Sequence, residues 1–299
     1  MKCVGLSFVL LVGSTFQAVK NLKHLVGAAV LAKHLRINNI QHVHVHFAFG
    51  AASVAIFLDA LTGIPYSLTI HGSDVLLPGP LVEEKLRRAK FIISNCRFHI
   101  KNLHRRFNSL TKQKFHVVRL GVDFHAGPWS RVRPSENDPC LRILNVARLE
   151  AVKAQHVLIA ACAKLRNEGI NFKCRIVGDG PRKEHLDQLI DDLELSDRVE
   201  LMGSRYEGDV IGFYDWSHVV TLSSSSEGTP MTIIEAMAKA RPVVAPNITA
   251  LPEMVIDGRT GFLFEPGSAK DLADKLAELA FRPSLITVMG KSGYLRAQE

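Results

Sequence analysis

Short apolar runs alternate with longer amphipathic segments through the second half of the chain. Apolar runs bounded by turn residues predict buried strands, and apolar residues at helical spacing predict helices. The predicted strands are 141–146, 172–177, 199–202, 218–222 and 242–245. The predicted helices are 157–169, 182–193, 210–216, one beginning near Met231, and 268–280. Regular alternation of strands and helices is typical of a parallel sheet covered on both faces.

The first half repeats this alternation after a long helix. Apolar positions recur at helical spacing from 19 to 35 with lysines between them, which predicts a basic amphipathic helix that packs on the core or contacts a membrane surface. The predicted strands are 42–46, 66–70, 90–95 and 116–120, and the predicted helices are 51–62, 83–89 and one from Cys96. The apolar run 3–13 is too short to span a bilayer, and we expect a core or membrane-apposed helix there rather than a signal peptide.

A segment rich in proline and polar residues separates the two halves. It reads AGPWSRVRPSENDP at 126–139 and has no hydrophobic period. Such a composition is typical of a linker between domains. We therefore predict an α/β protein with two Rossmann-like domains, at 1–125 and 141–299, joined by a linker at 126–140.

The charge of the chain is unevenly distributed. Residues 1–137 carry 18 lysines and arginines against 6 aspartates and glutamates, whereas residues 138–299 carry 19 against 23. The basic first half favours an anionic partner, such as a membrane surface or a lipid-linked diphosphate, although a solvated basic surface without a partner stays open. Nucleic acid is not expected, because no nucleic-acid-binding motif is present and aromatic residues make up only 7% of the chain.

The five cysteines are scattered and include no Cys-x-x-Cys pair. An odd number without regular spacing indicates buried thiols in a reducing compartment. We therefore expect a cytoplasmic protein, which lies on the cytoplasmic face of the membrane if its basic half binds lipid.

Three histidines, His42, His44 and His46, alternate along a predicted strand and so share one face. Imidazoles on one face suggest zinc. However, neighbours on one strand face lie about 6–7 Å apart, and no nearby carboxylate or cysteine completes a site. We expect no metal here, and predict instead a strand end that borders the ligand site.

The most informative stretch runs from Leu222 to Phe264, where a strand leads through a serine-rich loop into a helix that begins near Met231. The free N–H groups at a helix start suit a phosphate, and Gly228 lets the backbone approach a ligand closely. Glu227 and Glu235 lie on either side of this start. Glu235 can accept two hydrogen bonds from a ribose diol, and Glu227 can do the same for a sugar. A diphosphate between two polyols describes a nucleotide sugar.

This stretch resembles the retaining GT-B glycosyltransferases of family 4, also called glycosyl transferases group 1. Their two glutamates, separated by seven residues, stand here in Glu227-Gly-Thr-Pro and Glu235-Ala-Met-Ala, followed by Pro242-Val-Val. The resemblance covers about residues 38 to 290 and is strongest from 141 to 267; the histidine-rich strand is similar to members of the exopolysaccharide and colanic acid type. It implies a cleft between an N-terminal acceptor-side domain and a C-terminal donor-binding domain.

The resemblance also implies roles for individual residues. His71, at the end of a predicted strand, faces the donor sugar, and Arg148 and Lys153 bind the donor diphosphate, so that the expected catalytic residues are His71, Arg148, Lys153 and Glu227. The loop at Gly203 seats the base. The expected donor-binding residues are Arg148, Lys153, Gly203, Glu227, Gly228, Thr229, Pro230, Met231, Thr232 and Glu235.

The implied reaction moves a glycosyl group from a nucleoside diphosphate sugar to a saccharide or lipid-linked acceptor, with retention at the anomeric carbon, in polysaccharide or cell-envelope glycan synthesis. No two aspartates stand two positions apart, so the Asp-x-Asp metal motif is missing and metal-free catalysis without a cofactor is expected. A phosphate oxygen of the donor is expected to take the acceptor proton. Glu227 is expected to position a sugar hydroxyl rather than to act as a covalent nucleophile.

The sequence departs from the family pattern at both ends. Residues 1–37 contain neither the opening strand nor its glycine-rich loop, so the N-terminal domain is expected to be incomplete. At the other end, the chain is expected to stop before the long helix that closes the family's fold. The alternative function is therefore a catalytically impaired fragment or a nucleotide-sugar-binding scaffold at a membrane surface. A dehydrogenase is not expected, because Gly178-Asp-Gly180-Pro181 lacks the third glycine of the dinucleotide fingerprint. A phosphorylase of the same fold is less favoured.

Overall fold

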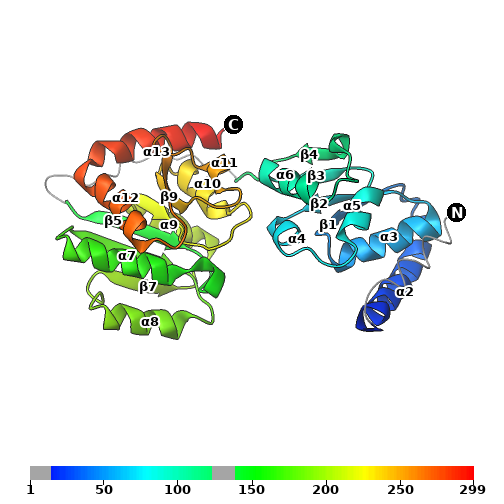
Figure 1. Ribbon diagram of the computed structural model, residues 1–299, viewed down its shortest axis with the longest axis horizontal. Coiled ribbons are helices and arrows are strands. Elements are labelled where there is room, and N and C mark those ends of the chain that lie inside the picture. Colours follow the sequence, from blue (N-terminus) through cyan, green and yellow to red (C-terminus); the bar gives the residue numbers. More distant parts are fainter. Residues whose placement is uncertain (1–14, 123–138) are drawn as a thin grey trace. The chain divides into compact units, whose positions relative to one another are not determined.

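The structure, a computed structural model, describes residues 15–122 and 139–299 (Figure 1). The chain divides into two compact units, Met1–Arg119 and Leu120–Glu299. The apolar run 3–13 lies outside the described residues. So does the predicted linker at 126–140, except for Pro139 and Cys140.

The first unit contains a four-stranded parallel sheet in the order β1-β2-β3-β4. Its strands are β1 (Val43–His46), β2 (Tyr66–Ile70), β3 (Ile92–Ser94) and β4 (Phe115–Val117). Its helices are α2 (Thr15–Ile37), α3 (Gly50–Thr62), α4 (Gly72–Leu76), α5 (Val82–Arg88) and α6 (Arg97–Arg106), with a 3₁₀ turn η1 (Lys112–Lys114). Leu68 and Ile92 share one apolar core with Phe57 of α3, Leu86 of α5 and Leu103 of α6, so these helices cover one face of the sheet.

The predicted strands and helices of the first unit are present, with one shifted strand. The last strand was expected at 116–120, but β4 ends at Val117, which pairs with Ser94. Because β3 itself ends at Ser94, later residues have no partner strand to extend the ladder. The short helix α4 was not predicted.

The second unit contains a six-stranded parallel sheet in the order β10-β9-β8-β5-β6-β7. Its strands are β5 (Leu141–Val146), β6 (Phe172–Val177), β7 (Val199–Gly203), β8 (Val219–Thr221), β9 (Val243–Pro246) and β10 (Gly261–Phe264). Its helices are α7 (Gln155–Asn167), α8 (Lys183–Asp192), α9 (Glu207–Trp216), α10 (Met231–Ala238), α11 (Leu251–Met254), α12 (Ala269–Phe281) and α13 (Pro283–Ala297), with a 3₁₀ turn η2 (Ala151–Lys153). The strand order changes direction between β5 and β8, where open α/β sheets bind their ligands.

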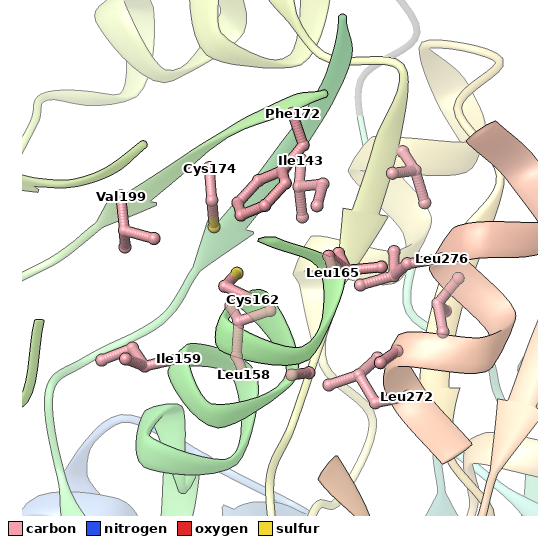
Figure 2. Close-up of a cluster of buried hydrophobic side chains, with 14 of the residues drawn as sticks. Ile143, Leu158, Ile159, Cys162, Leu165, Phe172, Cys174, Val199, Leu272 and Leu276 are labelled. Atoms are coloured by element: carbon pink, nitrogen blue, oxygen red, sulfur yellow. The ribbon is translucent and has the colours of Figure 1, made fainter. Parts of the chain in front are cut away.

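Both faces of this sheet are covered, as the sequence predicts. Ile143 and Leu144 are neighbours on β5, yet they belong to two different apolar clusters. Figure 2 shows the cluster around Ile143, where Leu158 and Leu165 of α7 and Leu272 of α12 lie against the sheet. The cluster around Leu144 includes Tyr214 of α9 and Ile233 of α10. Because apolar cores pack on both faces of this sheet, its strands and the loops at their ends are held in place.

Two elements near the C-terminus were missed. Strand β10 pairs with β9, and Gly261 comes so close that an added Cβ would lie 1.9 Å from the Val243 carbonyl oxygen. Helix α13 follows the last predicted helix, with Pro283 in its first turn, so the expectation that the helical region ends at Ala280 is wrong. Both elements contain glycines, which lower the local propensity for helix and strand.

Cys96, Cys162 and Cys174 are buried, Cys140 is half-buried, and no disulfide bond joins any of these four described cysteines. Hydrogen bonding to the neighbouring Cys174, together with burial, raises the pKa of the Cys162 thiol. The expectation of buried thiols therefore holds for three of the described cysteines. Within residues 15–122 and 139–299, no helix combines the length and the apolar character that a bilayer crossing requires.

Candidate functional site

The loops that follow β5 and β8 are fastened to each other at the centre of the second sheet. Ser225 donates its backbone N–H to the Val152 carbonyl oxygen over 2.9 Å. The Ser223 hydroxyl donates to the Lys153 carbonyl oxygen over 3.0 Å, and the Thr249 hydroxyl donates to the Glu227 carbonyl oxygen over 2.8 Å. The serine-rich loop is thus held along its length before any ligand binds.

This fastening brings Lys153 and Glu227 together, although 73 residues separate them in the sequence. The Nζ atom of Lys153 lies 2.6 Å from Oε1 of Glu227. The Ser224 hydroxyl donates to the same Oε1 atom, also over 2.6 Å. The Glu227 side chain is only 6% exposed, whereas that of Lys153 is 20% exposed. A nearly buried carboxylate is therefore paired with a cation that still reaches solvent.

Helix α10 begins at Met231, as the sequence predicts, and Pro230 precedes it. The Ile233 N–H already donates to the Pro230 carbonyl oxygen, and within the described residues no side chain caps the helix start. The Thr232 hydroxyl donates to the Val146 carbonyl oxygen over 3.1 Å and so ties the helix start to the end of β5. The buried hydroxyl oxygen of Thr229 has no hydrogen-bond partner in the described chain. The first backbone N–H groups of α10 and the Thr229 hydroxyl can therefore bind an anion.

Glu235 lies one turn inside α10 and accepts a hydrogen bond from Tyr214 of α9. The Tyr214 hydroxyl is 2.5 Å from Oε2 of Glu235. The tyrosine is 2% exposed, and burial together with the Glu235 carboxylate raises the pKa of its hydroxyl. Neither Tyr214 nor Ser224 was predicted from the sequence as a site residue. For Ser224, its place three residues before Glu227 was the available signal; Tyr214 is distant in sequence and gave none.

Arg148 takes a different position from Lys153. Its side chain is 75% exposed, and its guanidinium lies 2.6 Å from a carboxylate oxygen of Glu150. In the described chain it forms no hydrogen bond or ion pair with Glu227 or Glu235. The structure therefore joins Lys153 to the acidic pair and leaves Arg148 at the surface of the same loop.

Gly203 ends β7, and its carbonyl oxygen accepts the Gly178 N–H over 2.9 Å. Gly178 itself has a φ of 144°, and an added Cβ would lie 1.9 Å from the Ala147 carbonyl oxygen. The Gly-Asp-Gly turn thus packs directly on the loop that carries Arg148. This close approach gives the turn a structural role.

His71 belongs to the first unit and directly precedes α4. Its backbone N–H donates to Oδ2 of Asp74 over 2.8 Å. Its ring lies 4.3 Å from that of Phe47 between centroids, and its Nε2 lies 3.4 Å from Nδ1 of His46. Burial lowers the pKa of His71, with Asp74 opposing and His46 adding to the shift. At neutral pH this shift favours the uncharged form of the imidazole.

His42 and His44 of the histidine-rich strand hydrogen-bond to hydroxyls of the neighbouring strand β2. Ser67 Oγ lies 2.7 Å from a ring nitrogen of His42 and 2.7 Å from one of His44. The other nitrogen of His44 lies 2.8 Å from Thr69 Oγ1. Across the described ranges, no group of three or more His, Cys, Asp or Glu side chains is arranged to hold a metal ion. The rings of His42 and His44 are therefore held by side chains of β2, whereas His46 contacts His71.

Comparison with known protein families gives this arrangement a context. Residues 130–296 match the family model described as glycosyl transferases group 1. The chain belongs to the glycosyl transferases group 1 family. Residues 11–125 match a second model, Glycosyltransferase Family 4. The family that the Glu227 and Glu235 motif indicates is thus confirmed.

Two curated relatives of this glycosyltransferase family member cover different shares of it. A Salmonella typhimurium protein, whose name assigns it to colanic acid biosynthesis as a glycosyltransferase, is 35% identical over 174 residues. That match covers 56% of this chain and 42% of the relative, so the chain spans less than half of the relative's length. An uncharacterized glycosyltransferase of Methanocaldococcus jannaschii is 27% identical over 278 residues, which is 92% of this chain and 75% of the relative.

Among solved structures, the HepE protein of Anabaena in complex with UDP has a TM-score of 0.77 and 19% identity. The similarity covers 91% of this chain and 77% of HepE. Together with the two parallel sheets, it confirms the predicted α/β fold of the GT-B glycosyltransferases. In this family member the two glutamates of the motif are the ones that Lys153, Ser224 and Tyr214 contact.

Proposed function

We propose that the chain is a retaining glycosyltransferase that moves a sugar from a nucleoside diphosphate sugar to a saccharide or lipid-linked acceptor. The observation that carries the proposal is the Lys153 and Glu227 pair, held beside the uncapped start of α10. An anion-binding helix start and a neighbouring cation suit a diphosphate, and the paired carboxylate suits sugar hydroxyls. The match of residues 130–296 to the glycosyl transferases group 1 model supports this assignment.

The diphosphate is the leaving group, and stabilising its charge is the main catalytic task. In our proposal the N–H groups of Met231 and Thr232 bind phosphate, and the Thr229 hydroxyl adds a donor. Lys153 binds the diphosphate either by breaking its ion pair with Glu227 or by contacting both groups at once. Arg148 exchanges its ion pair with Glu150 for one with the same diphosphate. An exposed arginine can make this move at little cost, because it exchanges one surface ion pair for another.

The remaining contacts divide the donor into parts. Glu235 binds the ribose, Glu227 the transferred sugar, and the loop at Gly203 the base, with Gly228 and Pro230 shaping the turn between the glutamates. His71 of the first unit contributes to the sugar side of the reaction. The acceptor loses its proton to a donor phosphate oxygen. Metal independence belongs to this proposal and rests on the missing Asp-x-Asp motif.

The proposed pathway is the synthesis of a polysaccharide at the cell envelope. The Salmonella relative is named for colanic acid biosynthesis, and a second relative, from Erwinia amylovora, is named for amylovoran biosynthesis. HepE was solved with UDP, which makes a uridine donor the first candidate.

Calorimetric titration with UDP, GDP and ADP, with and without EDTA, tests the donor site. We expect one nucleotide to bind in both conditions, Glu235→Ala to abolish binding, and Glu168→Ala, which changes an exposed glutamate at the end of α7, to leave it intact. Absence of binding by every nucleotide would count against the transferase and against a nucleotide-sugar-binding scaffold, and would favour a catalytically impaired chain. The anomer of the product, read by NMR, tests retention: inversion relative to the donor contradicts it.

We further propose that α2 contacts an anionic lipid bilayer. One side of α2 is buried through Ala28 and Ala32, but the large apolar side chains on its other side are exposed. These are Val19, Leu22, Val26, Val30, Leu31 and Ile37. The helix contains no acidic residue, and its lysines, Lys20, Lys23 and Lys33, are exposed. An apolar stripe among cations is typical of an interfacial helix, and the shared positive charge disfavours pairing of two α2 helices.

Sedimentation with phosphatidylcholine vesicles, with and without phosphatidylglycerol, tests this contact. We expect binding only to the anionic vesicles, weaker at high salt, and at least about tenfold weaker after the double change Leu22→Ser and Val26→Ser. The matched control Val288→Ser, at an exposed valine of α13, should bind as the wild type does. Equal binding by the double variant would exclude α2 as the contact.

A further inference from the structure

The two glutamates of the proposed donor site share a feature that their sequence motif does not reveal. Each accepts a hydrogen bond from a hydroxyl of a nearly buried residue. Ser224, 2% exposed, donates to Oε1 of Glu227, and Tyr214, also 2% exposed, donates to Oε2 of Glu235. In the described chain, no hydrogen bond or ion pair reaches Oε2 of Glu227 or Oε1 of Glu235.

We propose that Ser224 and Tyr214 are positioning residues that each occupy one oxygen of a donor-binding glutamate and leave the other oxygen for the nucleotide sugar. A carboxylate has two oxygens and about four acceptor positions, so one bound hydroxyl fixes its rotation without exhausting it. The proposal rests on the proposed function of Glu227 and Glu235.

The surroundings of Tyr214 suit this task. Its backbone carbonyl oxygen accepts a hydrogen bond from Nε of the buried Arg241 over 2.9 Å and one from the Ser217 hydroxyl over 3.0 Å. Its ring packs in the same apolar cluster as Ile233 and Ala236 of α10. The hydroxyl also stays protonated, because burial and the Glu235 charge raise its pKa. Tyr214 is therefore a fixed donor on one side of Glu235.

Ser224 works together with Lys153. Both donate to Oε1 of Glu227 over 2.6 Å. The loop around Ser224 is held on either side, because Ser223 donates to the carbonyl oxygen of Lys153 and Ser225 to that of Val152. If Lys153 turns toward the diphosphate, Ser224 alone keeps Glu227 in place. Because Glu235 serves the ribose and Glu227 the sugar, the two hydroxyls should control different parts of donor affinity.

Titration of the full chain with UDP and with UDP-glucose tests this division, after the wild type has been shown to bind UDP. Failure of the wild type to bind any nucleoside diphosphate would refute the proposed function itself. We expect Tyr214→Phe to weaken UDP and UDP-glucose equally, by about tenfold. We expect Ser224→Ala to leave UDP within about twofold and to weaken UDP-glucose by about tenfold, with recovery in Ser224→Thr.

A double-variant comparison separates positioning from a general effect on the fold. In a Glu235→Asp background, which keeps a weakened carboxylate, Tyr214→Phe should cost much less UDP affinity than in the wild type. The controls are Tyr66→Phe and Ser53→Ala in the first unit, whose hydroxyls donate to the backbone oxygens of Lys85 and Phe49. Unchanged UDP binding in Tyr214→Phe overturns the role of Tyr214, and equal loss of UDP and UDP-glucose in Ser224→Ala overturns that of Ser224.

Discussion

Asp74 ties together two strand ends of the first unit through both of its carboxylate oxygens. Oδ1 accepts the Ala48 N–H and Oδ2 accepts the His71 N–H, each over 2.8 Å. Asp74 is 1% exposed, and the buried Lys85 donates to the carbonyl oxygens of Ala48 and Phe49 in the same region. Burial raises the pKa of Asp74, while its two backbone hydrogen bonds oppose that shift. His71 is thus held by a buried network.

Asp74→Asn should destabilise the first unit by about 2 kcal/mol, because the amide nitrogen would face an N–H donor that the carboxylate accepts. Urea denaturation followed by circular dichroism, with hydrogen exchange in peptides around Ala48 and His71, measures the loss. The control is Asp59→Asn, a half-buried aspartate of α3 that makes no side-chain hydrogen bond within the described residues. Equal stability of both variants would show that the two oxygens of Asp74 contribute nothing.

Acid should also weaken the first unit. Burial lowers the pKa values of His24, His44 and His71 below 6.5, so the unfolded chain binds these protons more readily than the folded one. The stabilisation is therefore complete above about pH 6.5 and is lost as the pH falls below it. We expect the urea midpoint to fall between pH 7.5 and 5.5, and to fall less in His44→Gln. A midpoint independent of pH, or an equal fall in the variant, would contradict this.

At the scale of elements, the close approach of α13 to the end of α10 decides how the second unit is closed. Gly290 of α13 is buried, and an added Cβ would lie 2.1 Å from the Ala240 carbonyl oxygen. Gly293, one turn further on, faces Met237. The missing side chains let the helix approach the backbone that follows the proposed donor-binding helix.

Gly290→Ala should therefore destabilise the second unit by about 1–3 kcal/mol, because backbone atoms must move to admit the methyl group. Gly212→Ala is the matched control, since Gly212 also lies in a helix but an added Cβ meets nothing within 4 Å. Alanine there should instead stabilise by about 0.5–1 kcal/mol. Thermal melting followed by tryptophan fluorescence compares them, and a stabilised Gly290→Ala would refute the packing argument.

At the scale of the whole molecule, the chain consists of two units that each bury their own apolar core. Every residue proposed to contact the nucleotide and diphosphate lies in the second unit, whereas His71 lies in the first. The units thus carry different parts of the proposed reaction.

The fragment 120–299 should consequently fold and bind the nucleoside diphosphate within about threefold of the full chain, while losing transfer, because the complete six-stranded sheet and both of its covered faces lie within it. Circular dichroism confirms folding and calorimetry measures affinity. A folded fragment without nucleotide affinity would show that the first unit supplies part of the nucleotide site.

The sequence by itself determined the parallel α/β character of both units and the segment that carries Glu227 and Glu235. Apolar periodicity and turn residues are local properties, and they express the burial of each strand and helix directly. The start of helix α10 at Met231 was predicted correctly from these local properties. Prediction failed for β10 and α13, because their glycines weaken the local preference for strand and helix. The end of β4 was predicted too late, because its partner strand β3 ends at Ser94.

Only the tertiary structure decided which side chains meet. It paired Lys153 with Glu227, turned Arg148 to Glu150, and placed the hydroxyls of Tyr214 and Ser224 on the two glutamates. Lys153 and Glu227, and likewise Tyr214 and Glu235, are far apart in the sequence. Their meeting depends on the order of the strands and on the packing of helices on both faces of the sheet, which a local pattern does not encode.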